Sequence, residues 1–144
     1  MLARILNTLK KDDAVFFEPV DERSLRFISS LLSSHRFPPV PVDYIALLKQ
    51  TDGLSWNGIE LYGTRANDRE ALGYTLPGLI EANLEYQQVA PMRGKLLLGC
   101  AAEELFVYDS LDQKYHIISR MDFSTSCSFP TFSEALYLFV DELF

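Results

Sequence analysis

The residues with the most chemical potential in this 144-residue chain are two histidines, two cysteines and several carboxylates. His35 and His116 lie in unrelated segments, without HxH, HExxH or a neighbouring cysteine, so the usual spacing of a metal site is missing. His116 alternates with Tyr115 and Ile117 as in a strand, which favours an ordinary sheet histidine over a catalytic base. We therefore expect no metal site and no cofactor.

Carboxylates offer the one remaining route to enzymatic chemistry. Glu103 and Glu104, with Asp109 or Asp112, flank a predicted hairpin and would suit a glycosidase if they faced one cleft, because such enzymes use two carboxyl groups about 5 Å or 6.5–9.5 Å apart. Acidic hairpin turns are common, however, and no GxSxG, Walker or GxGxxG motif occurs. A hydrolase acting on sugars is thus the least favoured interpretation, and we expect no enzyme.

The cysteines and the apolar segments bear on the compartment. Cys100 and Cys127 have no CxxC spacing and are too few for a disulfide framework, which indicates reduced thiols. Residues 1–11 lack the continuous apolar centre of a secretory signal, and runs such as Ala135–Val140 are far shorter than the roughly 20 residues of a membrane span. We expect a cytoplasmic protein with no membrane contact.

Charge is concentrated in one part of the chain. The formal net charge is −7, and the segment from Glu70 to Gln113 holds seven acids against only Arg93 and Lys95, a balance of −5. Such a field repels nucleic-acid phosphates and attracts a basic partner, although an ordinary solvated surface would have the same composition. The charge disfavours nucleic-acid binding and leaves a protein partner as the expectation.

The only tryptophan, Trp56, follows a predicted helix in a turn. Tryptophans are enriched as interface anchors, yet they equally fill the end of a core, and both interpretations stay open. Glu81 and Glu85 lie four residues apart and would share one helical ridge. Candidate residues for a partner-binding face are Trp56, Glu60, Glu81, Glu85, Glu103 and Glu104.

Apolar periodicity and capping residues predict five helices. Asp21 suits an N-cap, and Thr131 or Ser133 suits the cap of a final amphipathic helix. Pro41 suits the first position of a central helix, which is preceded by a stiff proline-rich connector. The predicted helices cover residues 2–11, Asp21 to the polar run 33–36, 41 to about 51, 79–87, and a final helix that starts after Thr131 or Ser133 and reaches Leu143.

Alternating and β-branched segments predict the strands. Asn57-Gly58 is a turn dipeptide before a strand in which Ile59 and Leu61 share one face. The stretch Leu105 to Tyr108 alternates in the same way, so we expect one of its two residue sets to face the core and the other to be partly exposed. The predicted strands cover residues 59–62, 72–76, 95–99, 104–109 and 114–119, whereas 64–69 is predicted as a loop.

These elements predict an α+β fold. Hydrophobic residues make up 48% of the chain and aromatic residues 12%, which indicates an ordered globule. No repeat or linker divides the chain, so residues 1–144 are expected to form a single domain. We expect a mixed or antiparallel sheet of four to six strands, with N-terminal, middle and C-terminal helices packed on it.

The order of the motifs resembles that of a known family. A proline-opened helix with Tyr44 is followed by Asp52-Gly53 and by the strand Glu60-Leu61-Tyr62-Gly63, and this order is similar to that of the SUKH superfamily. The Ser55-Trp56-Asn57-Gly58 insertion looks most like the bacterial YrhA-type branch. The resemblance spans about residues 38–144 and includes the later stretches Leu98-Gly99, Phe106-Val107-Tyr108-Asp109 and Ser128-Phe129.

That resemblance implies a function. The superfamily includes fungal cell-wall assembly regulators and many bacterial immunity proteins. It implies a non-enzymatic protein-binding domain, in particular an immunity protein that neutralises a cognate toxin, with a basic toxin domain as the partner. The alternative is a general interaction or regulatory adaptor of the fungal type.

Overall fold

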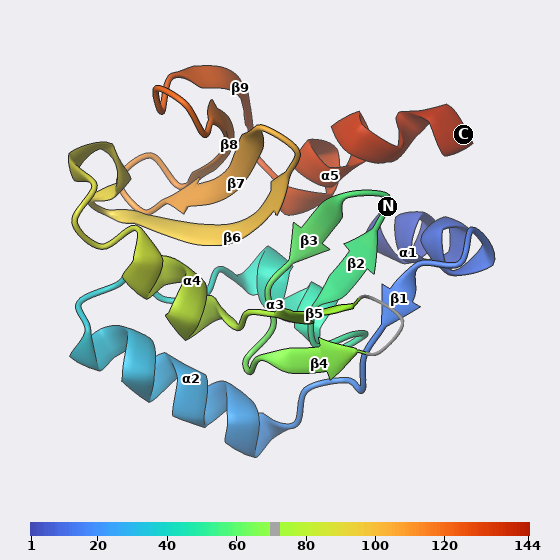
Figure 1. The fold of residues 1–144 in the computed structure, drawn as a ribbon, viewed down its shortest axis with the longest axis horizontal. Helices are drawn as coiled ribbons and strands as arrows, with labels where there is room; N and C mark the ends of the chain where they lie inside the picture. The colour runs from blue at the N-terminus through green and yellow to red at the C-terminus, as the bar shows by residue number, and fades with distance from the viewer. Residues whose placement is uncertain (70–72) are drawn as a thin grey trace.

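The structure, a computed structural model, describes residues 1–69 and 73–144 (Figure 1). Its α-helices are α1 (Leu2–Lys11), α2 (Glu22–Ser34), α3 (Val42–Leu48), α4 (Leu79–Glu85) and α5 (Phe132–Val140). Its strands are β1 (Val15–Phe16), β2 (Leu54–Trp56), β3 (Ile59–Leu61), β4 (Asn67–Arg69), β5 (Tyr74–Leu76), β6 (Lys95–Ala101), β7 (Glu104–Asp109), β8 (Lys114–Ser119) and β9 (Thr125–Phe129). Short 3₁₀ turns cover Ala90–Met92 and Asp141–Leu143. The α+β class is as predicted.

The main sheet is larger than the sequence predicts. Seven strands run in the order β1-β2-β3-β6-β7-β8-β9, and every neighbouring pair is antiparallel. The prediction of four to six strands is therefore wrong, because β1, β2 and β9 also join the sheet. A separate hairpin pairs β4 with β5, so part of the predicted loop 64–69 is a strand. Of the predicted strand 72–76, Leu72 lies outside the described residues and residues 74–76 form β5.

The helix boundaries follow the caps. The carboxylate of Asp21 accepts a hydrogen bond from the Ser24 N–H at 2.7 Å, and the hydroxyl of Thr131 accepts one from the Glu134 N–H at 3.3 Å. These side chains satisfy donors that the first turn of α2 or α5 leaves without a helical partner. Pro41 is the N-cap of α3 and not its first residue, so α3 begins one residue later than predicted, and it ends at Leu48, before the predicted end near Thr51. Helix α4 ends at Glu85, two residues before the predicted end.

The core lies between α5 and the middle of the sheet. The Phe106 ring on β7 lies 4.8 Å from the Phe139 ring and 6.4 Å from the Phe132 ring of α5. Leu105, Phe106 and Val107 are all buried, so the expectation that one residue set of β7 is partly exposed is wrong for these three positions. Both faces of this central strand are covered.

No helix in the described part of the chain is both long and apolar enough to cross a membrane. Cys100 is buried and Cys127 half-buried, and neither forms a disulfide.

Three buried phenols predict a pH limit to stability. Burial is the main cause that raises the pKa of Tyr44, Tyr62 and Tyr115 above their ordinary value near 10. A group whose pKa is higher in the folded state binds more protons there, so its stabilisation is complete below pH 10 and is lost as the pH rises above that value. We expect phenolate absorbance to show a fraction of the seven tyrosines ionising only together with unfolding. Reversible titration of all seven near pH 10, with the circular dichroism unchanged, would contradict this.

Candidate functional site

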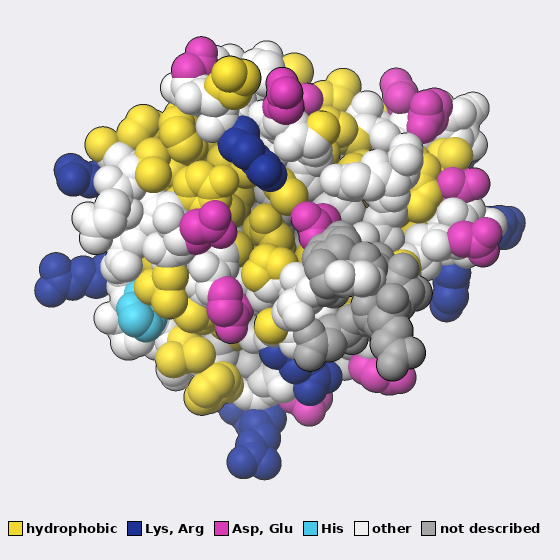
Figure 2. Space-filling view, in the orientation of Figure 1, with side chains coloured by type: hydrophobic (Ala, Val, Ile, Leu, Met, Phe, Trp, Pro, Cys, Tyr) yellow, Lys and Arg dark blue, Asp and Glu magenta, His cyan; other side chains and the backbone are white. Residues whose placement is uncertain are grey.

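Helix α4 carries an exposed acidic ridge. Glu81, Leu84 and Glu85 are exposed, and their spacing of three and four residues places them on one side of the helix. Leu79 and Ala82 on the other side are buried. On the face shown in Figure 2, acidic side chains lie over the region of α4 with hydrophobic side chains between them. We call Glu81, Leu84 and Glu85 the α4 ridge.

Asn83 fixes this helix to the sheet. It is 3% exposed, and its amide group donates to the Leu97 carbonyl at 2.9 Å and accepts from the Leu97 N–H at 2.8 Å. The same amide donates to the Leu79 carbonyl at 2.8 Å. The Asn83 side chain thus hydrogen-bonds to the backbone of β6 as a neighbouring strand would. It does so at Leu97, where the pairing of β3 with β6 has already ended. The hydrogen bonds of Asn83 therefore fix the position of the α4 ridge relative to the sheet.

The other predicted glutamates are spread over both faces of the sheet. Paired residues of neighbouring strands share a face, and successive residues alternate between faces. Glu60 pairs with Cys100, whereas Glu104 pairs with Ala101, so Glu60 and Glu104 lie on opposite faces. Glu103 is exposed in the β6–β7 turn. The structure therefore does not bring the predicted residues together on one face.

Glu60 has an unusual environment. One of its carboxylate oxygens is buried with no hydrogen-bond partner among the described residues, and the other lies 3.6 Å from the Cys100 sulfur. Burial raises the pKa of the Cys100 thiol and Glu60 adds to the increase, although a hydrogen bond with Tyr62 acts in the opposite direction. A thiol with a raised pKa is a poor nucleophile near neutral pH. Cys100 is thus an unreactive core thiol.

Trp56 contributes to the core. Its side chain is only 7% exposed, and the indole N–H donates to the Asp12 carboxylate at 2.9 Å. Trp56 pairs with Ile59, which pairs with Ala101, so it lies on the same face of the sheet as Glu104. Its burial favours the core-packing interpretation over that of an exposed anchor.

The predicted glutamates carry uncompensated charge. Among the described residues, none of the five makes an ion pair. The ion pairs that do form are Lys49–Glu22, Arg65–Asp52 and His116–Asp112. An exposed carboxylate without a cation beside it leaves its negative field available to a partner.

The carboxylates proposed for sugar hydrolysis lie at opposite ends of β7. Glu104 begins this strand and Asp109 ends it. At about 3.4 Å per residue the two positions are roughly 17 Å apart, well beyond the roughly 5–9.5 Å that glycosidases use. Glu103 precedes the strand and Asp112 follows it, so neither shortens the distance. The suggestion that these groups face one cleft is wrong.

A hydrogen-bonded chain that sequence reasoning missed joins Ser128, His116 and Asp112. The Ser128 hydroxyl lies 2.6 Å from Nδ1 of His116, and Nε2 lies 2.8 Å from the Asp112 carboxylate. Burial is the largest single influence on the pKa of Asp112 and raises it, but the hydrogen bonds from the Lys114 N–H and from His116, together with the charges of these two residues, hold that pKa below its ordinary value. His116 and Ser128 are paired residues of β8 and β9, and this pairing brings them together. No local sequence motif predicts the contact.

The hydrogen-bonded Ser128, His116 and Asp112 have the residue types of a hydrolytic triad but lie in a different environment from one. Ser128 is exposed on the edge strand β9, where an acyl substrate would not be shielded from water. Asp109, Asp112 and His116 each offer one possible metal-ligand atom, and these three atoms lie within 4.8 Å of one another. Exposed acidic groups commonly gather in this way without a metal. The arrangement joins the β7–β8 turn to β9.

Comparison with known proteins gives no assignment. No family model matches the sequence, and the search of curated proteins finds no significant match.

Proposed function

We propose that this protein is a non-enzymatic protein-binding domain that binds a basic protein surface through the α4 ridge. The observation that carries the proposal is the exposed, unpaired charge of Glu81 and Glu85 beside exposed Leu84, on a helix held by buried Asn83. Charged groups at an interface steer association, whereas a central apolar group contributes burial. The ridge combines both on one short helix.

The biological role that best fits is that of an immunity protein in a bacterial toxin system. The motif order similar to the SUKH superfamily supports it, as does the net charge of −7. Neutralisation would occur by occlusion: the acidic surface covers the basic active-site surface of a nuclease-like toxin, which itself attracts nucleic acid. We place this function in the cytoplasm, where reduced Cys100 and Cys127 are expected.

Charge reversal on the α4 ridge tests the proposal. We expect Glu81→Lys with Glu85→Lys to weaken partner capture by about tenfold or more, because attraction becomes repulsion at the contact. Tagged wild-type and variant proteins would capture partners from source-cell lysate at low and high salt. The control, Asp141→Lys with Glu142→Lys, makes the same charge change at exposed residues near the C-terminus, far from α4 in Figure 1.

The capture experiment also separates the alternatives. One basic, salt-sensitive, stoichiometric partner that the ridge variant loses and the control variant keeps is the expected result. Several partners of modest affinity would support the adaptor role instead. Equal capture by the wild type and the ridge variant would overturn the assignment of the α4 ridge.

A further inference from the structure

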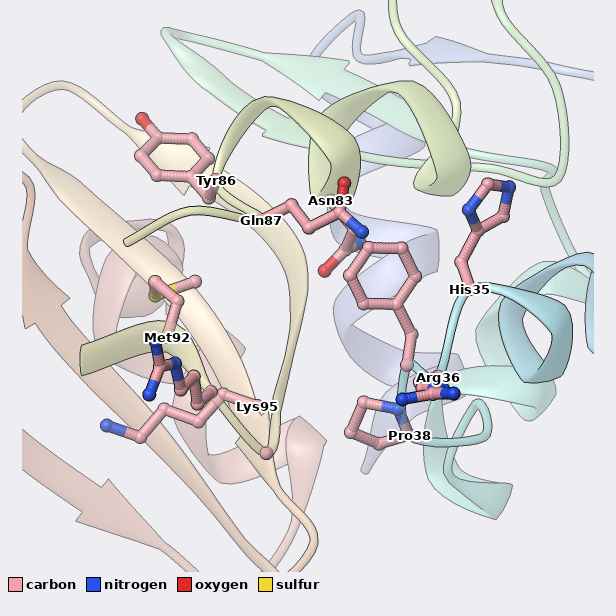
Figure 3. Close-up of a pocket in the computed structure, with 11 residues that line it drawn as sticks. His35, Arg36, Pro38, Asn83, Tyr86, Gln87, Met92 and Lys95 are labelled. Atoms are coloured by element: carbon pink, nitrogen blue, oxygen red, sulfur yellow. The ribbon is translucent and has the colours of Figure 1, made fainter. Parts of the chain in front are cut away.

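A cavity of about 290 Å³ lies between the end of α2 and the segment from α4 to β6. Figure 3 shows Arg36 and Pro38 on one side of it, Met92 and Lys95 on the other, and Asn83 and Gln87 between them. Sequence reasoning assigns no role to these residues, and the α4 ridge is not part of the lining. The cavity is therefore separate from the proposed partner-binding surface.

The lining is basic in an otherwise acidic protein. Arg36, Arg93 and Lys95 line the cavity, His35 adds a fourth nitrogen-bearing group, and no Asp or Glu is among the lining residues. Within residues 1–69 and 73–144, none of the three cations makes an ion pair. Cations gathered without a carboxylate repel one another unless an anion lies between them. Three cations without an ion-pair partner among the described residues therefore give the cavity a positive potential that favours an anion.

The backbone that carries Arg36 is held in place. Arg36 adopts the left-handed conformation with φ 62°, and its N–H donates to the Ser33 carbonyl at 3.0 Å. The next N–H, of Phe37, donates to the Leu32 carbonyl at 2.9 Å. This pair of bonds is a Schellman closure of α2. It fixes Arg36 and Phe37 at the edge of the cavity.

The opposite wall is also anchored. Gly94, between Arg93 and Lys95, has φ 75°, which glycine adopts without strain. Its carbonyl accepts hydrogen bonds from the Ser110 hydroxyl at 3.0 Å and from the Ser110 N–H at 3.3 Å. The turn that carries the two cations is thus tied to the end of β7.

Part of the remaining lining is apolar. Met92 is buried, and Phe37 and Tyr86 are half-buried. Asn83 also lines the cavity, but its amide is already engaged with the backbone of Leu79 and Leu97. Recognition would therefore come from the cations on one part of a ligand and from aromatic and thioether surface on the other.

We propose that this cavity binds a small organic anion. A phosphate or carboxylate group binds at the wall of Arg93 and Lys95, Arg36 adds positive charge from the opposite wall, and a flat apolar group lies against Phe37, Tyr86 and Met92 (Figure 3). Arginine provides paired donors that match either acid group. The proposal does not depend on the α4 ridge or on a toxin partner.

Titration of the isotopically labelled full chain by NMR tests the proposal with phenyl phosphate, benzoate and inorganic phosphate. We expect saturable amide shifts at Phe37, Gln87 and Gly94 with phenyl phosphate or benzoate, and the tighter of the two identifies the acid group. Inorganic phosphate should bind about tenfold more weakly than phenyl phosphate, because it lacks the apolar part. Equal affinity of these two phosphates would refute the role of the apolar wall.

Substitutions of the three cations test whether they bind the anion. Arg93→Gln with Lys95→Gln should raise the dissociation constant about tenfold or more, and Arg36→Gln should weaken binding through the other wall. Lys10→Gln with Lys11→Gln removes the same charge at exposed residues of α1, at the other end of the molecule in Figure 1, and should leave the affinity within about twofold. The amide spectra show directly whether each variant is folded. Absence of saturable shifts, or equal weakening by the control variant, would overturn the proposal.

Discussion

Replacement of Tyr44 by alanine is expected to lower the free energy of unfolding by about 3–5 kcal/mol, the range for loss of a buried aromatic side chain. Tyr44 is 0% exposed and packs edge-on against Phe132 of α5, with the ring centroids 5.1 Å apart. Its hydroxyl donates towards the Tyr62 and Leu98 carbonyls, the latter at 3.0 Å. Tyr44 therefore ties α3 both to α5 and to the sheet. Urea unfolding followed by circular dichroism measures the effect.

Tyr44→Phe is the matched control, because it keeps the ring and removes only the hydroxyl. We expect a smaller loss of about 1–3 kcal/mol, since two buried carbonyls lose their shared donor. A loss below about 1 kcal/mol for Tyr44→Ala would show that α3 does not depend on this contact.

Gly63→Ala is expected to destabilise the fold by about 3 kcal/mol or more, because overpacking against backbone is costly and cannot be relieved by a rotamer change. A Cβ atom at Gly63 would overlap the carbonyl of Asp52 and lie 2.6 Å from its carboxylate. Asp52 is 1% exposed and accepts hydrogen bonds from the Thr64 N–H at 2.6 Å and the Thr64 hydroxyl at 2.7 Å. Any shift that relieves the overlap would break these bonds.

Gly58→Ala provides the comparison. Gly58 has φ 82° but no atom within 4 Å of an added Cβ, so only the backbone conformation opposes alanine there. We expect a loss of about 1–2 kcal/mol. Thermal unfolding of both variants checks the order, and a Gly63→Ala protein as stable as Gly58→Ala would show that Asp52 can move at little cost.

Local signals were sufficient for elements whose ends are capped or whose pattern is regular. Helix α1 has its predicted bounds, as do β7 and β8, and Asp21 is the N-cap of α2 as expected. Strand β1 has only two residues, and in β9 only Cys127 and Phe129 alternate with polar residues, so neither strand carries a strong local signal. Both exist because a neighbouring strand offers hydrogen bonds, which a single sequence does not reveal.

The site was predictable only where its residues share one helix. Glu81 and Glu85 lie on one exposed ridge because their spacing guarantees it. Glu60 and Glu104 separate because faces depend on strand register, which the sequence did not define. The basic cavity is lined by Arg36 and Lys95, which lie almost 60 positions apart in the chain. Only tertiary packing brings them close, so no local pattern predicts this cavity.

The most direct test of the proposed function is titration calorimetry of the purified protein with its purified captured partner over a range of salt concentrations. The account predicts that the wild type binds its partner one-to-one and that its affinity falls steadily as the salt concentration rises. The affinity of the Glu81→Lys, Glu85→Lys variant should depend less on salt than that of the wild type. Tight binding that is unaffected by salt and by this variant would contradict the electrostatic role of the α4 ridge.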